Sequence, residues 1–488
     1  MTDKEMTKNL TCGSKAAKKT QGESGSDLQS GGADKKTQKS VLIVATVTSF
    51  ITTFMGSALN LSIPMLEAEF SANAATIGWV ITSYTLAVAA LSVPIGKIAD
   101  VTNRKMVFIL GVTLFGGFSL VCAFAKSITF LIIFRVLQGF AAAMIFATNN
   151  AMLISAYPAS QRGRVLGITT AAVYIGLSAG PVAGGFLNSY LGWESIFAVT
   201  SGIAVVALIL ALRGLPKTTR ENELKDLDIA GTVLYILMIT LSLYGLTDLS
   251  VKKYSWIILA AGILMGVLFV LRERKAEDPV IRVTMFSKDP TFTLSNLAAL
   301  LNYGATFSIS YLVSIYLQVV MGYGSQIAGL ILISMPLVQA LFSPMMGKLS
   351  DKIPPYKLAS AGMGLSAVGL IMFVLVGTAT PLWMVIGILV ISGFGFALFS
   401  SPNTNAVMAC VEKKDYSVAN SILATMRTVG HSSSMAIVTI VVGFTMGTTA
   451  LGEARPEELV HTMHICFIIF VALCVCGVFM SLKRKKRE

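Results

Sequence analysis

Long apolar segments constrain the fold of this chain more than any other feature. About 20 consecutive apolar residues are needed to cross a bilayer as a helix. Segments of that length are expected at residues 41–65, 76–95, 106–125, 129–155, 166–187, 195–213, 229–247, 254–271, 292–319, 326–346, 357–377, 381–406, 417–446 and 462–482. The chain is 54% hydrophobic and only 13% charged, whereas soluble domains are about 25% charged. The sequence therefore predicts an all-α membrane protein with fourteen spans.

The charges between these segments predict an orientation. If the N-terminus is inside, the cytoplasmic loops and C-terminal tail hold 24 of the 38 lysines and arginines. The N-terminal tail holds 8 more, the external loops hold 4, and Arg135 and Arg427 lie within spans. This asymmetry follows the positive-inside rule, so both termini are expected in the cytoplasm. The net charge of +13 is then expected to face anionic lipid, and no nucleic-acid partner is expected.

A short internal repeat indicates how the spans are organised. The sequence VPIGKIAD at 93–100 closes the second span, and SPMMGKLSD at 343–351 closes the tenth. Each copy falls in the second helix of a six-helix unit if two spans are inserted between the units. We expect a disordered cytoplasmic tail, because its composition is poor in apolar residues. Two bundles, an inserted pair and a basic tail are also expected, so that the divisions are 1–40, 41–213, 214–289, 290–482 and 483–488.

Three motifs in these spans resemble the fourteen-helix drug:proton antiporter branch of the major facilitator superfamily. They are GKIADVTNRK after the second span, RVLQGF in the fourth and GITTAAVYIGLSAGPVAGG in the fifth. The resemblance implies the major facilitator fold in a 6+2+6 arrangement. It also implies a transporter, not an enzyme, for which no cofactor or metal is expected.

The repeated motif supplies the first group of candidate functional residues. Asp100 and Arg104 are four residues apart and would pair on one helical face. The resemblance implies a latch between two conformations, formed by Gly96, Asp100, Arg104, Gly347 and Asp351. The alternative is an ordinary solvated turn.

A second group carries charge into the membrane. Arginine near the centre of a bilayer costs at least about 2.5–3.5 kcal/mol, so such residues usually have a function. Arg135, Gln138, Arg427 and His431 are the candidates for proton or substrate coupling. For Arg135 the alternative is an extended side chain that reaches the headgroups. For His431, whose ordinary pKa of about 6.5 suits proton transfer, the alternative is a structural hydrogen bond.

Polar side chains within other spans are candidates for a substrate cavity. At membrane depth, amides face other helices or water rather than lipid, and the alternative role is helix packing. The candidates are Asn60, Tyr84, Asn149, Asn150, Tyr174, Asn302, Tyr303, Gln339 and Asn403. The expected substrate is an amphiphilic small molecule.

The fifth span combines an apolar composition with several poor helix formers. Gly176, Gly180 and Gly184 recur every four residues, which predicts a face that a neighbouring helix approaches closely. Pro181 removes a hydrogen bond to the carbonyl of Leu177, and Gly185 completes the motif. The resemblance implies a dry, flexible seam between the two halves. The alternative is a static packing face.

The acidic residues qualify the expected function. All 25 fall in tails, loops or helix ends, whereas exporters of lipophilic cations commonly need a buried carboxylate. We expect a monomeric exporter, in the plasma membrane of a prokaryote, that works by alternating access in exchange for protons. One alternative is a uniporter or lipid translocator without proton coupling that prefers neutral or anionic amphiphiles. Another is a receptor or scaffold that transports nothing.

Overall fold

The computed structural model describes residues 34–71, 74–215, 228–247, 254–282, 285–286, 289–446 and 455–484. The first helices are α2 Lys35–Ala58, α3 Ile63–Phe70, α4 Ala74–Val101, α5 Arg104–Cys122, α6 Ile128–Ala156, α7 Arg162–Leu191 and α8 Glu194–Gly214. They are followed by α9 Ile229–Thr247 and α10 Ser255–Glu273. The last are α12 Pro290–Thr306, α13 Ser308–Ile315, α14 Ser325–Leu332, α15 Ser334–Ser350, α16 Pro355–Val374, α17 Leu382–Ala409, α18 Tyr416–Met446 and α19 Pro456–Leu482.

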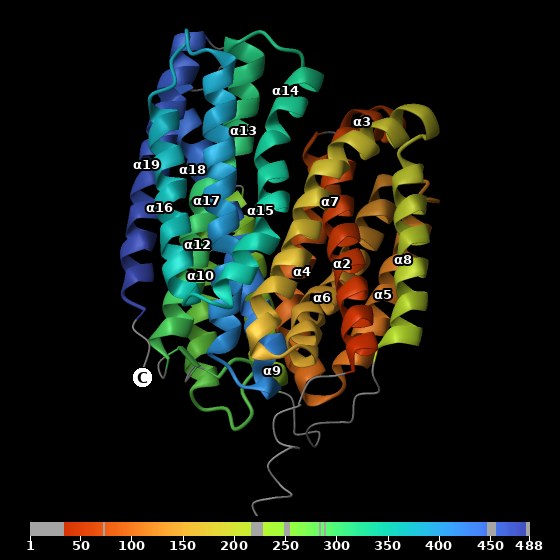
Figure 1. The fold of residues 1–488 in the computed structure, drawn as a ribbon. Coiled ribbons are helices and arrows are strands. Elements are labelled where there is room, and N and C mark those ends of the chain that lie inside the picture. The colour runs from red at the N-terminus through yellow and green to blue at the C-terminus, as the bar shows by residue number, and fades with distance from the viewer. Residues whose placement is uncertain are drawn as a thin grey trace, which may run out of the picture.

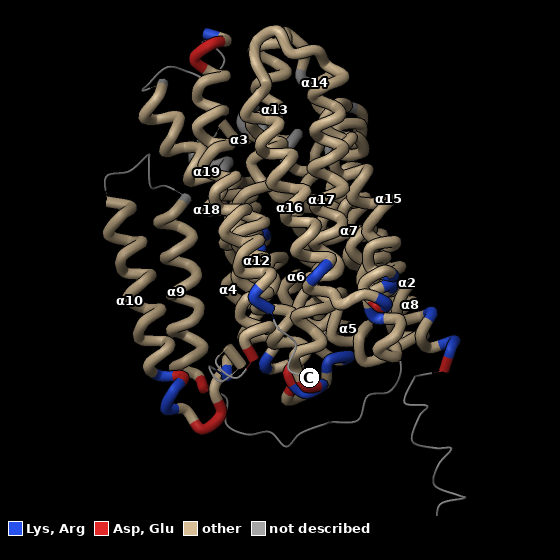
Figure 2. Tube along the Cα trace, turned by 60° about the vertical axis from the view of Figure 1, so that its left-hand side comes forward, with Lys and Arg blue, Asp and Glu red and all other residues tan. Residues whose placement is uncertain are grey.

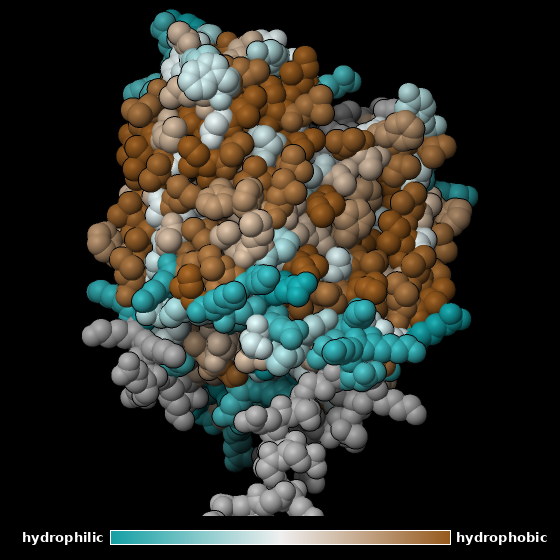
Figure 3. Space-filling model, in the orientation of Figure 1, coloured by the Kyte–Doolittle hydropathy of each residue, from teal (hydrophilic) through white to brown (hydrophobic). Residues whose placement is uncertain are grey.

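These helices confirm the predicted class of protein. Within the described ranges, fourteen helical segments are long and apolar enough to cross a membrane. Figure 3 shows the corresponding surface, a broad hydrophobic band with hydrophilic residues gathered toward its ends. A surface of this kind is stable against lipid, because the helices satisfy their own backbone hydrogen bonds.

The helices form two groups that lie side by side (Figure 1). The first group comprises α2 to α8, in which α2 packs on α7 and α4 packs on α6. The second group comprises α12 to α19, in which α17 packs on both α15 and α16. The pair α9 and α10 pack on each other, and α9 also contacts α4 and α18.

Charged side chains gather at one end of the bundle, which we call the charged end (Figure 2). At this end α4 and α15 finish and α7 and α18 begin. The start of α2 and the end of α19 also lie at this end. The other end of the bundle is called the opposite end.

One expected boundary differs from the structure. Residues 35–40, expected in the disordered tail, form the first turns of α2, because Gln38 is anchored to the end of α6. Its amide Nε2 donates to the carbonyl of Ala156 over 3.2 Å, and its own carbonyl accepts from the Tyr157 hydroxyl over 2.8 Å. The remainder of that tail, residues 1–33, lies outside the described residues.

The ninth and tenth spans are each interrupted. α12 gives way to α13 after Thr306, and a π-helical turn follows at Tyr316–Val320. α14 gives way to α15 at Ile333. Pro336 explains the second break, because it has no N–H to donate to the carbonyl of Leu332.

Candidate functional site

The predicted latch residue Asp100 joins the two helix groups at the charged end. It lies in the last turn of α4, and its carboxylate accepts from the backbone N–H groups of Ser417 and Val418 over 3.2 and 3.0 Å. These donors belong to the first turn of α18, where unpaired N–H groups and the helix dipole favour a negative charge. Arg104 completes the contact, since its guanidinium bonds Asp100 at 2.8 Å and reaches the carbonyl of Lys413.

Asp351 makes the same contact in the reverse direction. It follows α15 of the second group, and its two carboxylate oxygens accept from Gly163 and Arg164 over 2.6 and 2.9 Å. These N–H groups begin α7 of the first group. The repeated motif therefore forms two reciprocal caps, in which each aspartate holds the start of a helix in the other group.

Close backbone approaches reinforce both caps. A β-carbon built on Gly96 would lie 2.9 Å from the carbonyl oxygen of Ser417, and one on Gly347 would clash with the carbonyl of Gly163. Asn150 adds a third contact, because its amide donates to Asn420 across the groups over 2.8 Å. The two groups are thus locked together at the charged end.

The two caps also meet at one aromatic ring. The guanidinium carbons of Arg104 and Arg162 lie 5.9 and 5.7 Å from the ring centre of Tyr416. Tyr416 is the first residue of α18, and its side chain is 5% exposed. The ring therefore links the two caps through cation–π contacts.

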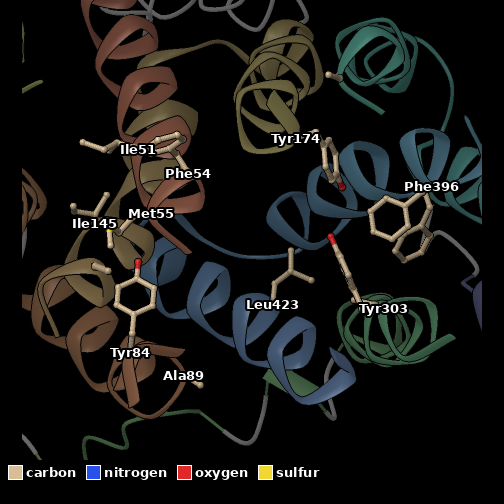
Figure 4. Packing of buried hydrophobic residues seen from close by; sticks show 14 of the residues in the cluster. Ile51, Phe54, Met55, Tyr84, Ala89, Ile145, Tyr174, Tyr303, Phe396 and Leu423 are labelled. Atoms are coloured by element: carbon tan, nitrogen blue, oxygen red, sulfur yellow. The ribbon is translucent and has the colours of Figure 1, made fainter. Parts of the chain in front are cut away.

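A cluster of aromatic and hydroxyl groups joins the helix groups in their middle. Tyr174 of α7 and Tyr303 of α12 both bond the hydroxyl of Ser400 in α17, at 3.3 and 3.1 Å. Figure 4 shows the two tyrosine hydroxyls directed toward each other from opposite groups. Both rings also pack edge-on against Phe396, with centroid distances of 5.9 and 5.1 Å.

Arg427 and His431 of α18 extend this cluster. The guanidinium of Arg427 lies 4.8 Å from the Tyr303 ring centre, and the His431 ring lies 5.4 Å from it. His431 also stacks on Phe307 at 4.1 Å. Both residues are half-buried, and the Nε of Arg427 is buried without a hydrogen-bond partner in the described part of the chain.

Arg135 and Gln138 lie apart from this cluster, inside the first group. Arg135 is fully buried, and its guanidinium bonds the carbonyl of Val80 at 2.8 Å and Gln138 at 2.6 Å. Gln138 in turn donates to Ser119 over 2.6 Å, and Arg135 lies 4.3 Å from the Tyr84 ring centre. The expected alternative for Arg135, an extended side chain at the headgroups, is therefore wrong.

The remaining polar candidates lie in separate places. Asn149 bonds Ser49 at 2.8 Å within the first group, and Asn403 bonds Arg484 at 2.9 Å within the second. Asn302 is fully buried, with no hydrogen-bond partner for its amide among the described residues, and Gln339 is buried in α15. The side chains of Asn60 and Pro181 lie outside what the structure describes.

The glycine face of α7 packs against α2, in the same helix group. A β-carbon on Gly176 would lie 2.7 Å from the carbonyl oxygen of Phe50, and one on Gly184 would lie 2.7 Å from the β-carbon of Ala58. The close approach is as predicted, but the expected seam between the halves is elsewhere. Gly167 makes that contact instead, because a β-carbon there would lie 2.5 Å from the carbonyl oxygen of Ser343 in α15.

The carbonyl that Pro181 leaves free in α7 has a partner. Proline has no N–H, so the carbonyl of Leu177 lacks its helical hydrogen bond. The hydroxyl of Ser57 in α2 donates to this carbonyl over 3.0 Å. Gly180 makes the contact possible, because a β-carbon there would lie 2.7 Å from the same hydroxyl oxygen. Gly185 directly follows Gly184, the last glycine of this face.

Several residues of this site carry no signal in the sequence. The caps use backbone N–H groups of Gly163, Arg164, Ser417 and Val418, which any residue other than proline could supply. Ser400 is one serine among many in the apolar spans. The one available signal is Tyr416, an aromatic residue directly after the cluster EKKD and before a long span.

Two helix groups that cap each other through a repeated motif have the architecture of membrane carriers built from two related halves. The chain matches the family model of the Major Facilitator Superfamily over residues 45–435, and again over 295–488. It therefore belongs to this superfamily and is a transporter rather than an enzyme. The resemblance inferred from its motifs is confirmed.

Characterised relatives match this chain over most of its length and most of their own. The chain is 29% identical to the riboflavin transporter RibZ of Clostridioides difficile, over 90% of this chain and 96% of that protein. It is 27% identical to the multidrug resistance protein Stp of Mycobacterium tuberculosis, over 87% and 80% of the two chains. Its fold is similar to that of the proton:xylose symporter XylE, with a TM-score of 0.67 at 13% identity, over 93% and 97% of the chains.

Proposed function

We propose that this protein exports amphiphilic small molecules by alternating access, in exchange for protons. The pair of reciprocal caps at Asp100 and Asp351 carries the proposal. Each cap holds the two helix groups together through hydrogen bonds, so it would break when the charged end opens. The structure would then represent the state that is closed at the charged end.

The proposed orientation places the charged end in the cytoplasm of a prokaryotic cell, with the protein acting as a monomer. The excess of lysine and arginine in the loops of that end supports this orientation. The 6+2+6 plan is supported by the packing of α9 and α10 outside the two groups. Export of amphiphiles is supported by the likeness to a multidrug resistance protein.

A second candidate is a carrier without proton coupling that prefers neutral or anionic amphiphiles. The observation that favours it is the position of the carboxylates. Among the described residues, every aspartate and glutamate lies in a loop, in a short helix or within a turn or so of a helix end. Likeness to a riboflavin transporter also fits a substrate that is not a cation.

The test is a substrate screen in proteoliposomes with an imposed proton gradient. If the first candidate is right, substrate flux follows the gradient and stops when an ionophore collapses it. Flux that is unchanged by the ionophore would support the second candidate. No flux of any amphiphile, in liposomes that contain correctly folded protein, would contradict both.

A further inference from the structure

We propose that the middle of the protein binds planar aromatic anions, with Arg427 as the counter-ion that selects them. The site is the central cluster, which comprises Tyr174, Tyr303, Phe396, Ser400, Arg427 and His431. This inference deepens the proposed transport function and rests on it for the fate of the ligand. Its test below separates binding from transport.

The members of the central cluster lie at one depth. With a rise of about 1.5 Å per residue, Arg427 is roughly 16 Å from the start of α18 and Tyr174 roughly 18 Å from the start of α7. On the same scale Tyr303 is roughly 20 Å from the start of α12, and Ser400 roughly 14 Å from the end of α17. Since the apolar core of a bilayer is about 30 Å thick, these side chains lie near its middle.

Arg427 has no counter-ion at this depth among the residues that the structure describes. Its Nε is buried without a hydrogen-bond partner, and the Tyr303 ring is an aromatic contact rather than an anion. The side chain as a whole is half-buried rather than fully buried, so part of its surface remains open to a ligand. Since the described carboxylates lie toward the helix ends, an anion brought by the ligand would supply the missing partner.

The rest of the central cluster favours a flat aromatic body. The rings of Tyr174 and Tyr303 stand at 86° and 77° to Phe396, and they come from opposite helix groups. Aromatic rings arranged in this way offer faces and edges for stacking with another ring. The hydroxyls of the two tyrosines, which meet at Ser400, place polar groups beside these rings for the polar edge of the ligand.

The same geometry excludes planar cations. A cation in this cluster would lie next to the guanidinium of Arg427 without a nearby carboxylate to offset the repulsion. Like charges brought together at a site cost binding energy, and specificity arises from such unfavourable contacts as much as from favourable ones. Between two planar ligands, charge is therefore expected to decide which one binds.

The experiment compares two planar dyes of opposite charge, fluorescein and ethidium, by fluorescence anisotropy on the purified full chain. The variants are Arg427→Gln and Arg427→Lys. The matched control is Arg213→Gln, which removes an exposed arginine at the end of α8. We expect fluorescein to bind more tightly than ethidium, and Arg427→Gln to weaken fluorescein binding at least about tenfold. Arg427→Lys should retain the preference for the anion, and the control should bind like the unaltered protein.

Two results would overturn the anion site: equal affinity for the two dyes in the unaltered protein, or unchanged fluorescein binding in a folded Arg427→Gln protein. The first result needs no variant, so it holds even if a substitution prevents folding. Fluorescein flux into proteoliposomes is measured separately. Binding that depends on Arg427 without any flux would leave the site intact and contradict the transport proposal. Fluorescein flux that is unaffected by Arg427→Gln would support the transport proposal and contradict the anion site.

Discussion

Gly347 lies where α15 touches α7, and adding one methyl group there tests the idea of a closed state at the charged end. A β-carbon at this position would clash with the carbonyl of Gly163 and lie 2.8 Å from the hydroxyl of Ser401. The carbonyl of Gly163 belongs to the backbone and cannot move aside by rotation of a side chain. The substitution Gly347→Ala is therefore expected to disfavour the closed state specifically.

The size of the effect follows from the cost of inserting a methyl group into a packed contact. Overpacking costs about 1–3 kcal/mol. At 1.36 kcal/mol for each factor of ten, the population of the closed state relative to the open one would fall about 5-fold to 150-fold. The open state escapes this cost, because the two helices would no longer touch there.

Hydrogen–deuterium exchange with mass spectrometry measures this shift without an attached probe. Peptides that cover residues 160–166 and 413–420 contain the N–H groups that bond Asp351 and Asp100. We expect faster exchange of both peptides in Gly347→Ala, with reduced transport. The control is Gly364→Ala in α16, where a β-carbon would meet nothing within 4 Å. Unchanged exchange and transport in Gly347→Ala would refute the reasoning.

Three further substitutions test other parts of the structure. Asp100→Asn removes the charge that holds Ser417 and Val418. We expect transport, measured as flux, to fall to background while membrane abundance, measured by immunoblot, stays normal. Normal flux would contradict the latch. Gly176→Leu forces a side chain against α2 and should abolish transport and lower the thermal unfolding midpoint, whereas Gly117→Leu, with open space around it, should do neither. Burial, with help from the Asp289 carboxylate, raises the pKa of the Cys410 thiol to about 12. Alkylation of Cys410 by iodoacetamide should thus be slow at pH 8 and accelerate as the pH rises toward 12. At pH 8 it should be faster in Asp289→Asn than in the unaltered protein. Equal alkylation rates of the Cys410 peptide in the two proteins would argue against a role of Asp289.

The sequence predicts the number of spans and the class of protein well, because hydropathy reports directly on what a bilayer requires. It also identifies the two cap aspartates, since the motif recurs at corresponding helices. It leaves open what each aspartate touches, because the partners are backbone N–H groups at helix starts, which carry no side-chain signature.

Packing partners are harder to predict than spans. The period-four pattern of Gly176, Gly180 and Gly184 indicates a face for close approach, but a small-residue face fits any helix of suitable shape. Only the three-dimensional arrangement distinguishes α2 from α15 as its neighbour. For the same reason, spacing places Arg427 and His431 on one face of α18 without indicating that Tyr303 lies beside them.

The helix α9 makes the two flanks of this protein unequal toward lipid. Its Tyr244 stacks on Trp79 of α4 at 5.6 Å, and its Tyr235 bonds Thr425 of α18 at 2.9 Å, so α9 covers the boundary between those two helices. On the other flank, α15 exposes Leu337 and Leu341 on its surface next to α7. An amphiphile dissolved in the bilayer would meet an extra layer of helices on the first flank and a single layer on the second. We therefore expect an amphiphile that enters from the membrane to do so by the flank that α7 and α15 form.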